Sequence, residues 1–289
     1  MRTLIVDNSN TRTKFALAVG NDIEPWRAMI PTPDISSDSL DQALAELNWD
    51  AAIISSVVPQ KAAIIGSWLE PKPVHHLSYR SKLPIGINYP HPEQIGADRL
   101  ANAAGAYTLF GSPCIVIDFG TAVTFDVIAA SHPADDREGV QAPADDREGV
   151  QAPADNREGV QAPADDRKGV QAPHPCYQGG VIAPGLASMT EGLASRTALL
   201  PHIKLQEPES AIGKSTEHAM LAGAVYGYRG LVREILHHLQ KELPANPAII
   251  ATGGDAPLIT SGMEEIHHLA PHLTLEGLGI IAKLNLPDL

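Results

Sequence analysis

The chain has 289 residues, of which 44% are hydrophobic, and its formal net charge at pH 7 is −13. This length and apolar content are enough to bury a large core, and they fit two compact lobes more easily than one. The acidic charge argues against a general affinity for nucleic acid or for an anionic membrane surface.

The cysteines and the N-terminus indicate a reducing compartment. Cys114 and Cys176 provide neither a disulfide framework nor the spacing of a zinc site. The N-terminal segment reaches Asp7 after too few apolar residues for a signal peptide, and no apolar run of the sequence is long enough to cross a bilayer. We therefore expect a cytoplasmic protein with neither a membrane nor a nucleic-acid partner.

The first predicted element is a β-hairpin with a carboxylate at the end of its first strand. Apolar residues 4–6 lead to Asp7, a polar turn contains Ser9 and Asn10, and a second apolar strand follows. Turn amides and small polar side chains suit an anion, while the carboxylate suits a cation that neutralises this anion. An Asp that only caps a turn is the simpler alternative.

Helices and strands alternate after this hairpin. The prolines of residues 22–37 predict a loop, and Ser37 or Asp38 then caps an amphipathic helix that carries leucines up to Leu47 on one face. Further predictions are a buried strand over 51–58, a helix over 59–69 and a short strand over 74–77. This alternation predicts an α/β architecture in which helices cover a sheet.

A helix entrance with adjacent opposite charges comes next. Residues 84–93 are rich in Pro, Gly and Asn, which argues against a long helix or a central strand. Asp98 and Arg99 then precede an alanine-rich helix over residues 100–109. On spacing alone, the simpler interpretation is an Asp stabilised by the helix dipole beside a solvated Arg.

Residues 114–128 predict a second hairpin that resembles the first. An apolar strand again ends in a carboxylate, and a short turn leads to a second apolar strand. The equivalent pairs are Asp7 with Asp118, Ser9 with Gly120, and Asn10 with Thr121. Two such hairpins indicate duplicated lobes that face each other across a cleft suited to a nucleotide phosphate with Mg²⁺, the alternative being two unrelated hairpins.

Residues 134–173 are four tandem copies of a ten-residue unit, ADDREGVQAP, with Asn156 and Lys168 as the main variations. Each copy has too little apolar surface to build a core. We expect an exposed, flexible insertion, because long insertions in surface loops cost little stability. A repeat-specific binding role is the alternative.

Two helices are predicted after the repeats. A strand flanked by glycines ends in the turn Pro184-Gly185, a helix follows over residues 186–200, and a long helix covers 215–243. The long helix carries small residues at spacings of four and three, namely Gly223, Gly227 and Gly230. This spacing favours close contact with another helix, either within the subunit or between subunits.

The last predicted strand, residues 247–251, leads into Gly253-Gly254-Asp255. Paired glycines between a strand and a helix leave room for a flat ligand or a phosphate against the backbone. A tight turn with Asp255 as a helix cap explains the same residues equally well.

Three local patterns are set aside. Gly213-Lys214-Ser215 lacks the first glycine of a P-loop, since Pro208 stands there. Gly277-Leu278-Gly279 lies too near Leu289 for the second strand of a dinucleotide fold. Three histidines, His267, His268 and His272, surround a proline that breaks the helix needed to align them on a metal.

A series of short motifs, in order along the chain, closely resembles the type III pantothenate kinases. The motifs are DNSNTRTK (7–14), SSVVP (55–59), GADR (96–99), DFGTAVTFD (118–126), GGVIAPG (179–185), RTALLP (196–201) and TGGDA (252–256). The resemblance covers nearly the whole chain outside the repeats. It implies the acetate and sugar kinase, actin and heat-shock ATPase superfamily, an α/β fold of two duplicated ribonuclease-H-like lobes with a nucleotide cleft between them. We expect an N-terminal lobe at residues 1–112 and a C-terminal lobe at 113–289, interrupted at 134–173.

The resemblance also implies an enzyme, a homodimer that phosphorylates pantothenate with ATP to 4′-phosphopantothenate, the first step of coenzyme A biosynthesis. Asp98 is the implied general base. The implied pantothenate contacts are Tyr89, Gly96, Ala97, Asp98, Arg99 and Thr197. The implied contacts with ATP and its Mg²⁺ are Asp7, Asn8, Ser9, Asn10, Thr11, Arg12, Thr13, Lys14, Thr121, Gly253 and Gly254. Asp118 is the implied ligand of a monovalent cation, K⁺ or NH₄⁺.

One residue departs from the family pattern, which has glycine where this chain has Ser9. If that position requires a positive φ, serine is strained by ~1 kcal/mol and the loop holds phosphate less well. The alternative to an enzyme is a non-catalytic nucleotide-binding regulatory protein on the same fold. A third interpretation is a related kinase with another hydroxylated substrate.

Overall fold

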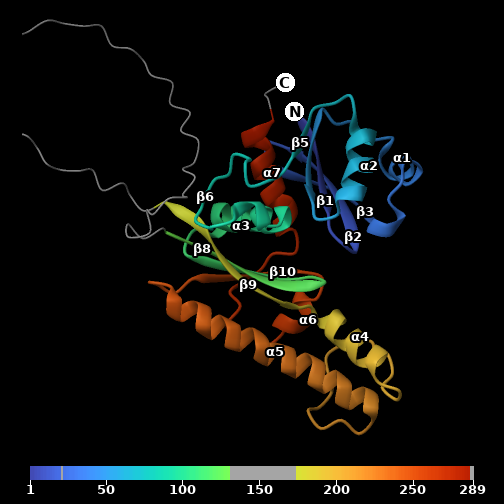
Figure 1. The fold of residues 1–289 in the computed structure, drawn as a ribbon, viewed down its shortest axis with the longest axis vertical. Helices are drawn as coiled ribbons and strands as arrows, with labels where there is room; N and C mark the ends of the chain where they lie inside the picture. Colours follow the sequence, from blue (N-terminus) through green and yellow to red (C-terminus); the bar gives the residue numbers. More distant parts are fainter. Residues whose placement is uncertain (21, 131–173, 287–289) are drawn as a thin grey trace, which may run out of the picture.

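Two β-sheets, with helices between them and on their outer faces, make up the described part of the chain (Figure 1). The computed structural model describes residues 1–20, 22–130 and 174–286. The decapeptide repeats, predicted as a flexible insertion, lie outside these residues.

The first sheet has five strands in the order β3-β2-β1-β4-β5. They are β1 (Arg2–Asn8), β2 (Arg12–Val19), β3 (Asp22–Pro31), β4 (Ala51–Ser56) and β5 (Val74–His76). β1 is antiparallel to β2 and parallel to β4. The predicted N-terminal hairpin and the two later strands are therefore confirmed.

The loop predicted for residues 22–37 is wrong over most of its length. β3 continues the hairpin by pairing antiparallel with β2, and a 3₁₀ turn, Thr32–Asp34, follows it. β3 is the edge strand of its sheet, with only β2 beside it. Such a strand tolerates Pro25, since a proline nitrogen that faces away from the neighbouring strand removes no ladder hydrogen bond.

The helix after this turn begins one residue earlier than predicted. α1 (Ser37–Leu44) is capped by Ser36, not by Ser37 or Asp38. The Ser36 hydroxyl accepts the backbone N–H of Ser39 at 3.2 Å, and the Ser39 hydroxyl accepts the backbone N–H of Ser36 at 2.9 Å. This reciprocal capping box satisfies two N–H groups at the helix entrance, while α2 (Pro59–Leu69) has its predicted bounds.

The second sheet repeats the plan of the first. Its strands, in the order β11-β10-β7-β8-β9-β6, are β6 (Gly86–Ile87), β7 (Cys114–Phe119), β8 (Ala122–Ala130), β9 (Pro175–Pro184), β10 (Ala248–Gly253) and β11 (His268–Leu269). β7 is antiparallel to β8 and parallel to β10, as β1 is to β2 and β4. The duplication that the two hairpins predicted is therefore confirmed.

Two helices fill the space between the sheets. α3 (Ala97–Phe110) follows the 3₁₀ turn Pro92–Gln94, and α7 (Leu273–Asn285) is the last helix described. A Cβ on Gly277 of α7 would lie 1.9 Å from the Ala101 carbonyl oxygen, so glycine lets the two helices touch along their backbones. The residues between the sheets form one apolar cluster, which includes Ile5, Ile53, Val116 and Ile250.

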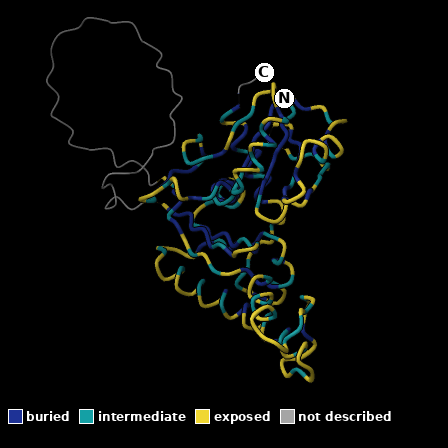
Figure 2. Tube along the Cα trace, turned by 45° about the vertical axis from the view of Figure 1, so that its right-hand side comes forward, coloured by how far each residue is buried: buried dark blue, intermediate teal, exposed yellow. Residues whose placement is uncertain are grey.

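The remaining helices cover the outer faces. α1 and α2 pack on the first sheet, whereas α5 (Thr216–Glu242) and α6 (Ala256–Thr260) pack on the second, and α4 (Leu186–Arg196) projects beyond the end of β9 (Figure 1). α5 alternates between buried and exposed residues, whereas the strands above it are mostly buried (Figure 2). α4 is shorter than the helix predicted over residues 186–200. Within residues 1–20, 22–130 and 174–286, no helix has the length and apolar character of a membrane span.

The predicted boundary between the lobes, after residue 112, stays a prediction. Sheet membership changes near it, since β5 is the last strand of the first sheet and β7 begins at Cys114. Two elements cross it: β6 pairs with β9 in the second sheet, and α7 packs on the first.

Candidate active site

The turns of the two hairpins meet at the end of the interface between the sheets. The hydroxyl oxygens of Thr11 and Thr121 are 3.0 Å apart. The turns are not identical, because Asn8 pairs with Thr13 whereas Phe119 pairs with Val123, so the N-terminal turn is one residue longer. The predicted equivalence of the two hairpins therefore holds at Asp7 and Asp118. After the turn the two hairpins are offset by one residue.

Asp7 carries the carboxylate of the first hairpin. It is 2% exposed, its Oδ1 accepts the Ser9 hydroxyl at 3.0 Å, and its Oδ2 lies 3.6 Å from the Lys14 Nζ. Lys14 is opposite Asp7 in the register of the hairpin. Burial raises the pKa of Asp7 to about 6, although the Lys14 charge and the Ser9 hydrogen bond oppose this shift.

Asp118 carries the carboxylate of the second hairpin, and it has a different neighbourhood. Its register partner is Thr124, not a lysine, and its Oδ2 accepts the amide of Asn102 at 2.9 Å. Thr274 donates to the other end of that amide at 2.7 Å, which fixes the orientation of Asn102. Desolvation raises the pKa of Asp118, against the hydrogen bond from Asn102.

Gly253 leaves open the space beside the other oxygen of Asp118. Its φ is +96°, and a Cβ there would lie 2.6 Å from Asp118 Oδ1 and 2.6 Å from the Phe119 nitrogen. A side chain at this position would fill the place beside the carboxylate. The glycine therefore has two reasons to be there, its left-handed backbone and the room it leaves.

Asp98 lies in the first turn of α3, where the N-terminal end of the helix favours a negative charge. Its Oδ1 accepts the backbone N–H of Arg99 at 2.8 Å. Burial raises the pKa of Asp98, while the backbone hydrogen bond and the charge of Arg99 lower it. The charge of Asp98 in turn raises the pKa values of Asp7 and Asp118, so the three carboxylates share one electrostatic environment.

Arg99 points to a buried carboxylate that the sequence did not single out. Its Nε and Nη2 each lie 2.7 Å from Oδ1 of Asp126 on β8. Tyr177 of β9 donates its hydroxyl to the same oxygen at 2.9 Å, and its ring packs edge-on against the ring of Tyr89, with centroids 6.1 Å apart. The predicted pantothenate residues Tyr89 and Arg99 therefore lie around Tyr177.

The loop after β10 completes the predicted nucleotide side. The backbone N–H of Asp255 donates to the Phe119 carbonyl at 3.3 Å, which joins this loop to the second hairpin. Burial raises the pKa of Asp255, and the nearby charge of Arg12 lowers it. Arg12 and Asp255 thus interact electrostatically from the two halves of the fold.

Two predicted nucleotide contacts are occupied within the protein. The Asn8 amide donates to the Thr13 hydroxyl at 2.8 Å, and Asn8 Oδ1 accepts the Ser56 hydroxyl at 2.7 Å. Asn8 and Thr13 are both buried, so their side chains hold the first loop in shape, whereas Asn10, Thr11 and Arg12 are exposed.

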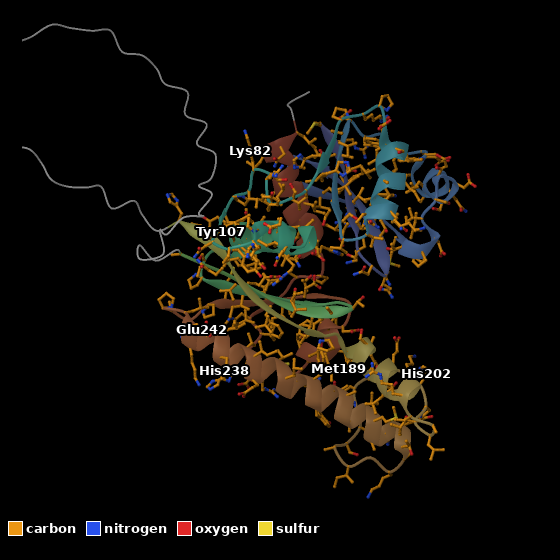
Figure 3. All side chains as sticks on the ribbon, in the orientation of Figure 1. Lys82, Tyr107, Met189, His202, His238 and Glu242 are labelled. Carbon is orange, nitrogen blue, oxygen red and sulfur yellow. The ribbon has the colours of Figure 1, made fainter. Side chains whose placement is uncertain are left out.

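Thr197 is the predicted site residue that lies apart from the others. It follows the C-terminus of α4, and its hydroxyl donates to the Leu193 carbonyl at 2.9 Å. Together with Pro184, Met189 and Arg196 it lines a pocket of about 440 Å³. Figure 3 labels Met189 on α4, away from α3. Among the described residues no hydrogen bond or ion pair joins Thr197 to Tyr89, Gly96, Asp98 or Arg99.

The sequence patterns did not predict three polar residues of the site, Asn102, Asp126 and Tyr177. Asn102 stands one helical turn after Asp98, a spacing that puts both on one face of α3. Asp126 closes the motif DFGTAVTFD, but only the packing of β8 against α3 reveals its partner. No local signal distinguishes Tyr177 from a core tyrosine.

No cluster of three or more His, Cys, Asp or Glu side chains that would hold a metal occurs in the described part of the chain. Two of the histidines that the sequence excluded as metal ligands make structural contacts. His267 Nδ1 accepts the Ile249 N–H at 2.9 Å, and His268 stacks on Phe110. The carboxylates of Asp7 and Asp118 still fit cations that take most ligands from phosphates, carbonyls and water, as Mg²⁺ does beside nucleotides.

Solved structures share this fold along nearly the whole chain. A Baf family protein from Campylobacter jejuni aligns with a TM-score of 0.52 and 16% identity, over 97% of each chain. The ethanolamine utilization protein EutJ from Carboxydothermus hydrogenoformans aligns with a TM-score of 0.51 and 12% identity, over 97% of this chain and 90% of the other. The duplicated sheets and the carboxylates at their hairpins define a protein of two ribonuclease-H-like lobes, the fold class of the actin-like ATPases and sugar kinases.

The chain belongs to the type III pantothenate kinase family. The sequence model of that family matches residues 3–133 and 170–238, and its gap falls within the decapeptide repeats. A type III pantothenate kinase from Akkermansia muciniphila is 49% identical over 99% of this chain and 100% of its own length. Those of Methylacidiphilum infernorum and Acidiphilium cryptum are 33% and 35% identical, over 97% and 98% of this chain and 88% and 94% of their own lengths. The family resemblance found in the motifs is therefore confirmed.

Proposed function

We propose that Asp98 is the general base in the transfer of a phosphoryl group from ATP to pantothenate. As a member of its family the chain phosphorylates pantothenate to 4′-phosphopantothenate, the first step of coenzyme A biosynthesis. The observation that carries the site is the electrostatic coupling of Asp7, Asp98 and Asp118, which come from three separate elements. A pKa of Asp98 raised by burial makes its carboxylate a better proton acceptor for the pantothenate hydroxyl.

The first hairpin is our candidate for the phosphate side. Phosphoryl transfer needs in-line positioning and neutralised charge more than covalent help. We expect the exposed residues 10–12 and the ammonium of Lys14 to bind the phosphates. Thr121 and Gly253-Gly254 would contact ATP from the second half of the fold. Mg²⁺, when bound beside Asp7, would neutralise charge on the phosphates.

The second hairpin is our candidate for the monovalent cation, K⁺ or NH₄⁺. Asn102 occupies Oδ2 of Asp118, and the missing side chain of Gly253 leaves Oδ1 accessible. Asp118 has no lysine opposite it, in contrast to Asp7. A large, weakly hydrated cation bound there would supply the positive charge that the second hairpin lacks.

Pantothenate would lie at the entrance of α3, between Asp98 and the aromatic ring of Tyr89. Gly96 and Ala97 form the backbone of this entrance, and Arg99 supplies a cation held in place from below. Thr197 lies apart from this entrance within one chain. We infer that it serves the pantothenate site of a second subunit, in a homodimer.

Two exposed surfaces support the homodimer. α4 and the segment after it expose Met189, Leu193 and Leu199, the last at 91%. Gly223, Gly227 and Gly230 of α5 have nothing within 4 Å of an added Cβ in the described part of the chain. Analytical ultracentrifugation of the wild type and of Leu193→Glu tests the dimer, and a monomeric wild type would overturn it.

We also infer that the enzyme acts in the cytoplasm, with ATP and pantothenate as its small-molecule partners. Cys114 is a free, buried cysteine, and burial raises its pKa to about 12, which makes its thiol inert. A thiol that carries no disulfide suits the reducing cytoplasm.

The test of the function is a coupled ATPase assay with and without pantothenate. Asp98→Asn should lose most of its turnover, on the order of 10²–10⁴-fold, while its ATP affinity is retained. Asp38→Asn, in the first turn of α1, is the matched control and should be fully active. Near wild-type activity of Asp98→Asn would refute the base, and no turnover by the wild type would refute the enzyme.

The cation proposal needs its own assay. The wild type should turn over pantothenate in K⁺ or NH₄⁺ and lose activity when Na⁺ replaces them. Asp118→Asn should lose this dependence together with most of its activity. Equal wild-type rates in K⁺ and Na⁺ would refute the monovalent cation site. They would not affect the proposal that Asp98 is the general base.

A further inference from the structure

The guanidinium of Arg99 is held by a single oxygen of one buried carboxylate. Nε of Arg99 donates to Oδ1 of Asp126 at 2.7 Å, and Nη2 forms an ion pair with the same oxygen at 2.7 Å. Asp126 is 0% exposed, and the Arg99 side chain is 13% exposed. An ion pair this buried needs further hydrogen bonds to offset its desolvation.

Those further bonds come from the strands of the second sheet. Tyr177 donates its hydroxyl to Asp126 Oδ1 at 2.9 Å, and Thr124 donates to Oδ2 at 3.2 Å. The Tyr177 ring also lies beneath the guanidinium, 5.7 Å from its central carbon. Asp126 thus accepts three hydrogen bonds and forms an ion pair with Nη2 of Arg99, which a buried carboxylate can accommodate without water.

Glycines of β9 bring this strand close enough for the arrangement. Asp126 pairs with Gly180 in the register of β8 and β9. A Cβ on Gly180 would lie 1.6 Å from the Phe125 carbonyl oxygen, and one on Gly179 would lie 3.1 Å from the Tyr89 ring. The glycines therefore let β9 pass between Asp126 and Tyr89.

The contact with Asp126 determines which part of the Arg99 guanidinium remains available to a ligand. Its Nε and Nη2 edge is used by Asp126, and the described residues accept no hydrogen bond from Nη1. The backbone N–H of Arg99 donates to Asp98 Oδ1 at 2.8 Å, so Arg99 connects Asp126 to the carboxylate proposed as the base. Asp126 compensates the charge of the guanidinium. A ligand therefore depends more on the direction in which Nη1 points than on the net charge of the pair.

From this geometry we propose that Asp126, supported by Tyr177 and Thr124, is a positioning residue that aims Arg99 at pantothenate. It touches neither ATP nor the reacting atoms, and it acts only through Arg99. The proposal rests on the pantothenate kinase function of the site. It assigns a role to the last residue of the motif that begins at Asp118.

The first test compares Michaelis constants. Asp126→Asn should raise the KM for pantothenate about tenfold or more and leave the KM for ATP within about twofold. Tyr177→Phe keeps the ring and removes one hydrogen bond, so it should raise the pantothenate KM by a smaller factor. Val127→Ala, the next residue of β8, is the matched control for lost stability and should change neither KM.

A double-mutant cycle separates positioning from a general loss of structure. In an Arg99→Ala background, Asp126→Asn should change the pantothenate KM no further. A full additional tenfold effect there would overturn the proposal, as would an unchanged pantothenate KM in Asp126→Asn. Equal rises of both Michaelis constants would indicate a purely structural role and would overturn it too.

An NMR measurement tests the contact between Arg99 and Asp126 without relying on turnover. The ¹⁵N–¹H spectrum of the arginine side chains should contain a slowly exchanging Nε–H that is lost in Arg99→Lys, separate from that of Arg229, whose Nε donates to the Ile259 carbonyl. This signal should broaden or exchange rapidly in Asp126→Asn, and rapid exchange in the wild type would contradict the proposal. A wild type with the protected signal and no pantothenate turnover would refute the proposed function and, with it, Arg99 as a pantothenate contact.

Discussion

The hydroxyl groups of Thr11 and Thr121 lie 3.0 Å apart, although 110 residues separate them along the chain. Each stands in the turn of one hairpin, and each hairpin has a carboxylate at the end of its first strand. The contact therefore closes the two halves of the proposed phosphate site against each other.

Thr121→Val should weaken ATP binding, because valine keeps the shape of threonine and loses its hydroxyl. One hydrogen bond to a charged group is worth ~1.5–3 kcal/mol, so the KM for ATP should rise by roughly one to two orders of magnitude. The KM for pantothenate should change little. Thr108→Val is the control, since the Thr108 hydroxyl bonds only to the Ala104 carbonyl in its own helix; equal ATP constants in both variants would contradict the role of Thr121.

Gly96→Ala should lower kcat strongly and change the stability of the protein little. A Cβ at this position would lie 2.5 Å from Asp98 Oδ1, the far end of a side chain that can move aside. A displacement of about 1 Å at a catalytic group costs on the order of 10²-fold in rate. Steady-state kinetics and thermal unfolding check this, with Gly66→Ala in α2 as the control, because its Cβ meets only ordinary contacts. A fully active Gly96→Ala enzyme would argue against Asp98 as the base.

The elements of the site were predictable where the signal is local. The two hairpins and α3 were predicted because an apolar strand, a polar turn and an alanine-rich run are each read within about ten residues. β3 was missed because prolines and half-exposed residues resemble a loop, and only its pairing with β2 makes them a strand. Tertiary pairing here overrides local propensity.

The contacts that orient the site were not predictable, because they join residues distant in the chain. The bond from Arg99 to Asp126 spans 27 residues, and that from Thr274 to Asn102 spans 172. Both depend on how helices pack on sheets, which a single sequence does not specify. The motifs also grouped Thr197 with the other pantothenate residues, whereas one chain keeps it apart from them.

Ser9→Gly should bind Mg²⁺-ATP more tightly than the wild type. Gly120, the equivalent residue of the second hairpin, has a φ outside the left-handed region, so the second hairpin gives no sign that this position needs a left-handed backbone. The Ser9 hydroxyl instead occupies Asp7 Oδ1 at 3.0 Å, an oxygen that would otherwise be available to a cation. Calorimetric titration of both proteins measures the difference, with Ser210→Gly as a loop control. Equal affinities would show that Ser9 does not compete for Asp7.

Asp7→Asn should make the cation-free protein more stable at pH 7. The pKa of Asp7 is about 6 in the folded protein and lower when unfolded, because burial raises it. The folded state therefore holds more protons between about pH 4 and 6, and its free energy of unfolding falls as pH rises through this range, by on the order of 2–3 kcal/mol from this group. Asn cannot titrate, so denaturant unfolding in metal-free buffer should show a shallower pH dependence for Asp7→Asn, whereas the exposed Asp38→Asn should match the wild type. An unchanged pH dependence, or lower stability of Asp7→Asn at pH 7, would mean that Lys14 and Ser9 compensate the buried charge fully. Saturating Mg²⁺ should stabilise only the wild type and the control.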